Sequence, residues 1–266
     1  MSSMKDKVII VTGASSGIGR ATALRFAKAL ATVVLVARSE DALHNLAGEI
    51  TEAGGNAKVI ACDLLEEASV ERVIKGTVDE FGGIDVVVNA AGIIQSGSVE
   101  TTSLADWDRM MAINVRSPFY LMQLAMPHLE KRGGNVVNVS SVTGVRAFPG
   151  VVAYCTSKAA MDQLTHCVAL EMAPKGVRIN AVNPGVVVTN LHKAGGMDED
   201  AYAAFLEHSK TTHPLGRAGE DVTKRALARD RLTLETNRLC GTIYSAVHKN
   251  GRPQSFSLRP VLFLPP

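Results

Sequence analysis

A tyrosine and a lysine four residues apart, Tyr154 and Lys158, form the strongest chemical feature of the sequence. They begin a segment with a helical pattern, and residues i and i+4 of a helix share one face. An ammonium group beside a phenol favours the phenolate, so Lys158 is expected to lower the pKa of Tyr154 from its unperturbed value of about 10. Such a pair could move a proton near neutral pH. The spacing alone fits an ordinary surface pair equally well, so other motifs must decide.

A glycine-rich segment near the N-terminus has the composition of a phosphate-binding loop. It follows an apolar stretch directly and opens a helical pattern. Glycines allow a tight turn and a close approach to a pyrophosphate, while the helix N-terminus supplies free N–H groups. The spacing is G-x-x-x-G-x-G, and the absence of Gly-Lys-Ser/Thr excludes a Walker loop. The residues expected to hold the phosphates are Gly13, Ser15, Ser16, Gly17, Ile18 and Gly19.

A cation, Arg38, follows the second apolar stretch, after Ala37. NAD-binding folds place an acidic residue near this point to bind the adenosine ribose hydroxyl. A guanidinium group suits a 2′-phosphate instead, and no carboxylate is there to repel it. The pattern therefore predicts NADP(H) in preference to NAD(H), with a solvated arginine at a strand end as the alternative.

Short β-branched stretches alternate with longer amphipathic ones along the first two thirds of the chain. Near-continuous apolar runs are typical of strands buried on both faces. The pattern predicts an α/β fold, a Rossmann-type doubly wound parallel sheet flanked by helices on both faces. The predicted strands are 8–12, 32–37, 57–61, 84–89, 134–140 and 177–183, and the predicted helices are 18–30, 41–53, 67–81, 104–129 and 154–172.

These motifs, in this order, resemble those of the short-chain dehydrogenase/reductase family, in particular its NADP-preferring carbonyl and 3-oxoacyl reductases. Ser141 precedes Tyr154 by 13 residues, as in the family, which makes the neighbouring Ser140 the weaker candidate. The resemblance covers residues 4 to about 220. The matching motifs are the loop at 13–19, Cys62-Asp63-Leu64, Asn89-Ala90-Ala91-Gly92, Asn114, Ser141, Tyr154-x-x-x-Lys158 and Asn183-Pro184-Gly185 with Thr189.

The resemblance implies an oxidoreductase that transfers a hydride between NADP(H) and a carbonyl or secondary alcohol. Tyr154 would donate or accept the proton, and Ser141 would polarise the substrate oxygen. Lys158 would lower the tyrosine pKa and hold the nicotinamide ribose, and Asn114 would hold a water that links the lysine to solvent. The implied cofactor contacts beyond the glycine loop are Arg38, Asp63 at the adenine, Leu64, Asn89 at the adenosine ribose, Ala90, Gly92, Tyr154, Lys158, Pro184, Gly185 and Thr189 at the carboxamide.

The resemblance places a catalytic domain at 1–216, with a substrate lid at about 190–213. The acidic run 198–200 is typical of a first helical turn, and Tyr202, Phe205 and Leu206 share one side of that helix. These side chains would cover the substrate or pack on the domain.

The family pattern ends after the segment 216–220. The segment 217–266 is an atypical basic tail, with nine Lys/Arg against four Asp/Glu and no clear strand pattern. The family ends instead with a helix and a short strand. The tail therefore leaves open a non-catalytic or unstable cofactor-binding variant, and it puts a tetramer in doubt.

Bulk composition narrows the remaining partners and the compartment. A net charge of +2 gives no reason to expect nucleic acid or a membrane surface. The longest apolar runs are strand-length and no signal peptide is visible, so the expected location is the cytoplasm. The four cysteines and seven histidines show no metal spacing, so no metal is expected.

The expected partners are a small carbonyl or alcohol substrate and a second copy of the chain, in a homodimer formed through the helices 104–129 and 154–172. The sequence leaves open whether the substrate is an acyl thioester, a steroid or a retinoid.

Overall fold

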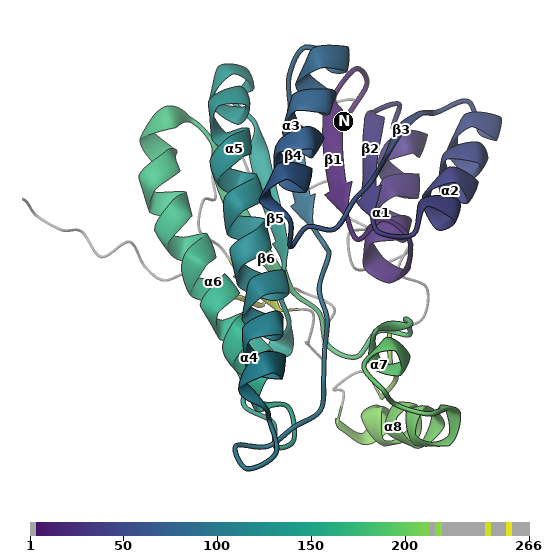
Figure 1. Ribbon diagram of the computed structural model, residues 1–266, viewed down its shortest axis with the longest axis vertical. Helices are drawn as coiled ribbons and strands as arrows, with labels where there is room; N and C mark the ends of the chain where they lie inside the picture. The colour runs from purple at the N-terminus through teal and green to yellow at the C-terminus, as the bar shows by residue number, and fades with distance from the viewer. Residues whose placement is uncertain (1–3, 213–215, 220–242, 246–253, 257–266) are drawn as a thin grey trace, which may run out of the picture.

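Eight strands form one sheet, in the order β3-β2-β1-β4-β5-β6-β7-β8, in the computed structural model, which describes residues 4–212, 216–219, 243–245 and 254–256 (Figure 1). The first six strands are parallel, and their order reverses between β1 and β4. This strand order and direction confirm the predicted Rossmann-type fold. These strands are β1 (Val8–Thr12), β2 (Thr32–Ala37), β3 (Asn56–Ala61), β4 (Val86–Asn89), β5 (Asn135–Val139) and β6 (Arg178–Asn183).

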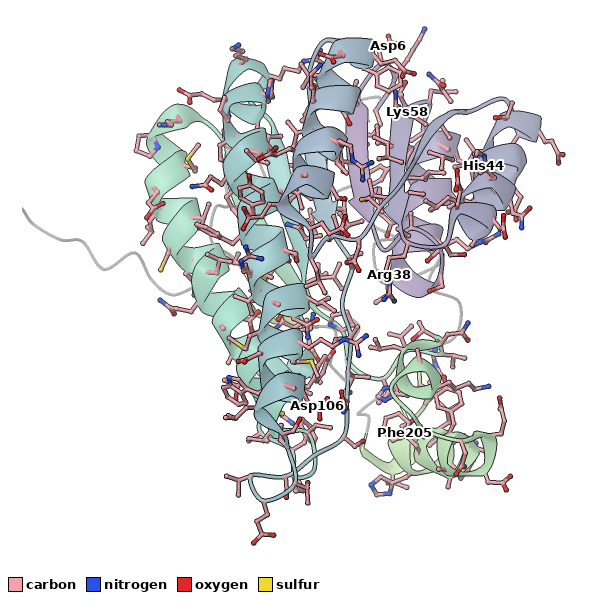
Figure 2. The ribbon with its side chains drawn as sticks, viewed as in Figure 1. Asp6, Arg38, His44, Lys58, Asp106 and Phe205 are labelled. Carbon is pink, nitrogen blue, oxygen red and sulfur yellow. The ribbon has the colours of Figure 1, made fainter. Side chains whose placement is uncertain are left out.

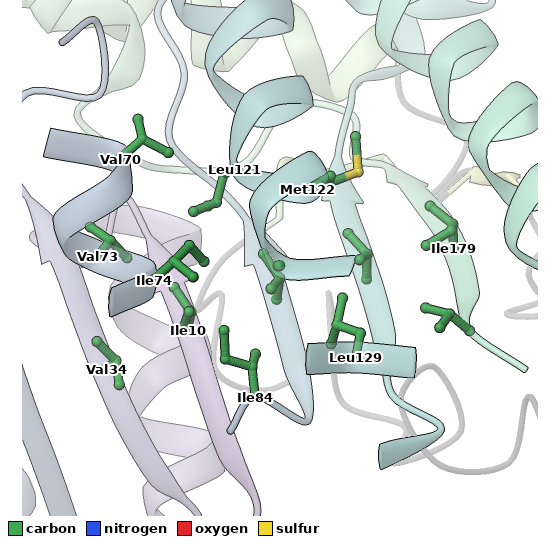
Figure 3. Packing of buried hydrophobic residues seen from close by; sticks show 14 of the residues in the cluster. Ile10, Val34, Val70, Val73, Ile74, Ile84, Leu121, Met122, Leu129 and Ile179 are labelled. Carbon is green, nitrogen blue, oxygen red and sulfur yellow. The ribbon is translucent and has the colours of Figure 1, made fainter. Parts of the chain in front are cut away.

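Helices cover both faces of the sheet, because each buried strand turns alternate side chains to opposite sides. On β1, Ile10 packs in a core with α3, α5 and α6 (Figure 3), whereas Ile9 and Val11 pack with α1 and α2. The helices are α1 (Gly17–Lys28), α2 (Glu40–Glu52), α3 (Glu67–Phe81), α4 (Leu104–Met111), α5 (Ser117–Arg132), α6 (Val152–Met172), α7 (Leu191–Ala194) and α8 (Glu199–Thr212). Among the described residues, no helix has the length and apolar composition needed to cross a membrane.

The structure differs from the sequence pattern within the predicted helix 104–129. A π-helical segment, Ala112–Arg116, separates α4 from α5. Pro118 has no N–H, so it cannot donate the hydrogen bond that the carbonyl of Asn114 would accept in an α-helix. The break therefore falls at Asn114, one of the predicted catalytic residues.

The second difference lies in the basic tail, where two short strands extend the sheet. The strand β7 (Ile243–Ser245) pairs with β6 in parallel, and β8 (Gln254–Phe256) pairs antiparallel with β7. Each has three residues, too few to show a period in the sequence, and each forms because an open sheet edge offers unpaired backbone groups. The rest of the tail, Cys240 included, falls outside the described residues apart from Arg217, Ala218 and Gly219.

A buried carboxylate ties the amino-terminal edge of the sheet together. Asp85 accepts hydrogen bonds from Lys7 Nζ at 2.8 Å, the Val8 N–H at 3.0 Å and Arg132 Nη1 at 2.8 Å. Burial opposes its ionisation, but these three donors outweigh burial and lower the pKa of Asp85 below 3.8. One carboxylate thus joins β1, the loop before β4 and the end of α5.

We expect Asp85→Asn to lower the free energy of unfolding at pH 7 by about 1–3 kcal/mol, because an amide cannot satisfy all three donors. A lowered folded-state pKa stabilises the protein above the unfolded value of 3.8 and loses that effect as the pH falls through the folded value. The difference between the two proteins in urea unfolding should therefore shrink below about pH 4.

The matched control is Asp79→Asn, which breaks an exposed ion pair with Lys75. It should change the stability by less than about 0.5 kcal/mol. Equal losses from the two variants would contradict the assigned role of Asp85.

Candidate active site

The predicted site residues gather at the carboxyl edge of the sheet, around the point where the strand order reverses. In open α/β sheets this point forms a crevice that binds ligands. The loops after β1, β4, β5 and β6 meet there. Figure 2 shows Arg38, at the end of β2, on the edge of the sheet that faces α7 and α8.

The glycine loop after β1 is folded so closely that side chains are excluded at two positions. Gly13 has φ of +65°, and a methyl group there would lie 2.8 Å from Ala91 N. A methyl group at Gly19 would lie 2.2 Å from Gly13 O. The two glycines therefore permit the tight, closely packed turn that a pyrophosphate-binding loop requires.

The N-terminus of α1 is suited to an anion. Its N-cap residue, Ser16, is extended and makes no side-chain hydrogen bond to the first turn, which contains no acidic residue. The first N–H groups of an α-helix have no partner within the helix, and the dipole there favours negative charge. The residues Gly17, Ile18 and Gly19 thus present backbone donors at the predicted phosphate position.

Thr12, which the sequence reasoning missed, joins the loops after β1 and β4. Its Oγ1 accepts hydrogen bonds from the N–H groups of Ala90 and Ala91, both at 3.1 Å, and donates to Val88 O at 3.4 Å. The available signal was a hydroxyl at the end of an otherwise apolar strand, since a buried hydroxyl needs a partner.

The predicted adenosine contacts lie after β3 and at the end of β4, and a hydrogen bond holds each of them in place. The Leu65 N–H donates to Asp63 Oδ1 at 3.0 Å, and Ser117 Oγ donates to Leu64 O at 2.8 Å. Asn89, buried at the end of β4, donates to Asn138 Oδ1 at 2.8 Å. These contacts fix the loops after β3 and β4 relative to β5 and α5.

Three of the four predicted catalytic residues lie together, Tyr154 and Lys158 at the start of α6 and Ser141 just after β5. The hydroxyl group of Ser141 lies close enough to that of Tyr154 to favour its phenolate form, and the Thr143 N–H donates to Ser141 Oγ at 3.2 Å. Lys158 Nζ donates to Val139 O at 2.9 Å and lies 5.7 Å from the centre of the Tyr154 ring. The lysine and the tyrosine are both buried.

Burial governs the charges of this group. It raises the pKa of Tyr154 to about 12, although the nearby Ser141 hydroxyl acts in the opposite sense. It lowers the pKa of Lys158 to about 8, against the attraction of Asp162. The direction for Tyr154 is the reverse of the sequence expectation, because desolvation outweighs the opposing effect of Ser141. At neutral pH the phenol therefore carries its proton.

The fourth predicted catalytic residue, Asn114, lies near Lys158, next to Gly92. Its side chain accepts from the Ile93 N–H and donates to Ile93 O, both at 2.9 Å, and donates to Ser157 Oγ at 3.0 Å. A methyl group at Gly92 would lie 3.2 Å from Asn114 Oδ1 and 3.6 Å from Lys158 Nζ. The loop after β4, the π-helical segment and α6 therefore meet at this asparagine.

Two further polar residues, Asn183 and Asp162, form a hydrogen-bonded group with the backbone of Ser141. Asn183 Nδ2 donates to Ser141 O at 2.7 Å and to Asp162 Oδ2 at 2.8 Å. All three residues are buried. The sequence signal for Asp162 was its spacing of four from Lys158, which places both on one face of α6.

The loop after β6 completes the site. The Val142 N–H donates to Pro184 O at 3.0 Å, and Gly185 follows at the carboxyl edge. A methyl group at Gly17 would lie 3.1 Å from Thr189 Cγ2, so Thr189 lies against the glycine loop. Thus the predicted phosphate and carboxamide contacts come from adjacent segments.

No cluster of three or more His, Cys, Asp or Glu with the geometry of a metal site occurs in the described part of the chain. Cys62, Cys155 and Cys167 are free there.

Comparison with known proteins agrees with this geometry. A model of the family described as short chain dehydrogenase matches residues 7–200. An uncharacterized oxidoreductase of Thermotoga maritima is 41% identical over 218 residues, which cover 82% of this chain and 86% of that protein. A 3beta-hydroxysteroid dehydrogenase of Mediterraneibacter gnavus is 38% identical over 199 residues, covering 74% and 72%.

Among solved structures, a 3-ketoacyl-(acyl-carrier-protein) reductase from Brucella melitensis complexed with NADH matches with a TM-score of 0.83 at 28% identity. The match covers 92% of this chain and 98% of that one.

Gly19→Ala should displace the glycine loop, because the added methyl would meet the backbone of Gly13. We expect a loss of dinucleotide affinity of at least about ten-fold, measured by calorimetry, since the backbone donors would move away from the phosphates.

Gly48→Ala is the matched control. Gly48 lies on the exposed side of α2, with nothing within 4 Å of an added methyl. It should leave affinity unchanged and stabilise the fold by about 0.5–1 kcal/mol. Unchanged affinity in Gly19→Ala would reject the phosphate assignment.

Proposed function

Because the chain belongs to the short-chain dehydrogenase family of oxidoreductases, we propose that it transfers a hydride between NADP(H) and the carbonyl or secondary alcohol of a small molecule. The observation that carries the proposal is the placement of Ser141 and Tyr154 together beside the buried Lys158.

The residues at the carboxyl edge fit a dinucleotide. The glycine loop has no room for side chains at Gly13 and Gly19, and the first turn of α1 is uncapped. When bound, the cofactor supplies or takes up the hydride. The chain's own residues bind its phosphates at the N-terminus of α1 and orient its nicotinamide end near Thr189 and Lys158.

Arg38 supports NADP(H) as the preferred form. It is exposed, directly after a strand that ends in Ala37, so its guanidinium is available for a 2′-phosphate. The Brucella reductase was solved with NADH, so that structure does not support a preference for NADP(H). The preference proposed for this chain rests on Arg38.

The proton chemistry suits reduction of a carbonyl. With its pKa raised to about 12, Tyr154 is a phenol at neutral pH and can donate its proton to the substrate oxygen. Ser141 Oγ accepts from the Thr143 N–H, so its own hydrogen is free to reach the same oxygen. The ammonium group of Lys158 would stabilise the phenolate left behind.

The surroundings of Tyr154 favour a substrate with an apolar body. Partly buried apolar side chains pack around Tyr154, Ala153 and Met110, namely Ile93, Ile94, Trp107 and Val151. A steroid or an acyl chain, as named for two of the similar proteins, meets this requirement.

Tyr154→Phe should lower kcat with a carbonyl substrate by about 10²–10⁴-fold while NADPH binding stays near normal, because only the transferable proton is removed. NADPH binding is measured as a rise in melting temperature. Saturation at about 100 times the dissociation constant contributes about 2.7 kcal/mol.

Tyr120→Phe is the control, since Tyr120 bonds Glu71 on the outside of α5 and α3. It should leave kcat unchanged. Full turnover by Tyr154→Phe would reject the proton role. If NADPH does not raise the melting temperature of the unaltered protein, the non-catalytic alternative is favoured.

Arg38→Asp should reverse the cofactor preference. Loss of a charge-assisted hydrogen bond to the 2′-phosphate, at about 1.5–3 kcal/mol, predicts about a 10- to 100-fold weaker affinity for NADPH. NADH affinity should hold or improve. Titration of both cofactors by fluorescence measures the ratio.

A charge reversal far from the site, Lys131→Asp in the last turn of α5, controls for net charge. An unchanged NADPH/NADH ratio in Arg38→Asp would remove this residue from the cofactor site.

A further inference from the structure

The helix α8 is fastened to the site by one side chain that no step of the proposed mechanism uses. Tyr202, in the first turn of α8, is buried, with 6% of its surface exposed, whereas most residues of this helix are exposed. Figure 2 shows α8, with Phe205 labelled, beside α7 and opposite the edge of the sheet that carries Arg38. The buried phenol therefore points inward from a peripheral element.

The hydroxyl of Tyr202 binds both backbone groups of Thr189. It accepts from the Thr189 N–H at 3.3 Å and donates to Thr189 O at 3.0 Å. Thr189 lies in the loop between β6 and α7, outside regular structure, so its backbone gains these partners from the phenol. One side chain thus fixes the position of one loop residue.

Thr189 in turn touches the glycine loop and α7. Its Cγ2 lies 3.1 Å from the position of a methyl group at Gly17, and its Oγ1 accepts from the Leu191 N–H at 3.4 Å. A continuous series of contacts therefore runs from α8 through Tyr202 and Thr189 to the N-terminus of α1.

Neighbouring groups hold the phenol ring in place. Lys193 Nζ lies 5.0 Å from the centre of the Tyr202 ring and is paired with Glu199 at 2.6 Å. The ring of His192 lies 6.3 Å from Tyr202 and 4.5 Å from Phe205. A phenylalanine at position 202 would keep these ring contacts and lose only the two hydrogen bonds to Thr189.

We propose that Tyr202 is a positioning residue that couples the segment α7–α8 to the nicotinamide half of the cofactor site by holding the backbone of Thr189. The inference rests on the proposed function, which assigns Thr189 to the carboxamide. Cofactor binding at Thr189 and docking of α8 then stabilise each other, since both require the same loop geometry.

The test compares a whole dinucleotide with a fragment that lacks nicotinamide. In Tyr202→Phe, we expect NADPH to bind about ten-fold more weakly, while 2′-phospho-ADP-ribose changes by less than about two-fold. General unfolding of the site would weaken both ligands equally. Amide hydrogen exchange at Thr189, measured without any ligand, should become faster in the variant, because its N–H loses the phenol oxygen.

Tyr120→Phe is again the matched control and should change neither affinity nor the exchange of Thr189. An equal loss of NADPH and fragment affinity in Tyr202→Phe, or none, overturns the inference even where Thr189 exchanges faster. If the unaltered protein binds the fragment as tightly as it binds NADPH, the assignment of Thr189 in the proposed function fails instead.

Discussion

The contact between the loops that follow β1 and β4 determines how the whole site is built. Gly13 lies so close to Ala90 and Ala91 that no side chain fits between them, and Thr12 Oγ1 binds both N–H groups of that pair. Parallel strands run out of backbone partners at their carboxyl ends, so these groups must be satisfied locally. Next to this contact, the N-terminus of α1 has no side-chain cap. In the loop after β4, Gly92 lies against Asn114 and Lys158.

What the sequence could predict was whatever depends on local pattern. The helix 67–81 and the strands 8–12 and 32–37 match the structure residue for residue, because burial on two faces leaves a continuous apolar run and burial along one helical stripe leaves a strong period. The break at Ala112–Arg116 was missed, although Pro118 marked it, because the helical period continues on both sides. The strands β7 and β8 exist through pairing with a distant edge, which three residues cannot encode.

The site residues divide in the same way. Tyr154, Lys158 and Ser141 are found from motif spacing, and the structure brings them together. Asn183 belongs to a matching motif, but its bonds to Ser141 and Asp162 could not be predicted, because they join the end of β5, the end of β6 and the middle of α6, segments that are separate in sequence. The pKa of Tyr154 could not be predicted either. Spacing shows which charge is near, but the sign depends on how far water is excluded, and only the packed structure shows that.

Burial acts in the same sense on both members of the pair, because it favours the neutral form of each side chain. Desolvation disfavours phenolate and ammonium alike, so the pKa of Tyr154 rises to about 12 and that of Lys158 falls to about 8. Before proton transfer, the proposed reduction has a cation facing a neutral phenol in a poorly solvated site. After transfer, phenolate and ammonium form a pair whose attraction is strong where water is excluded. In the proposed reaction, Lys158 would thus stabilise the phenolate that proton donation leaves behind, a form of electrostatic stabilisation of developing charge.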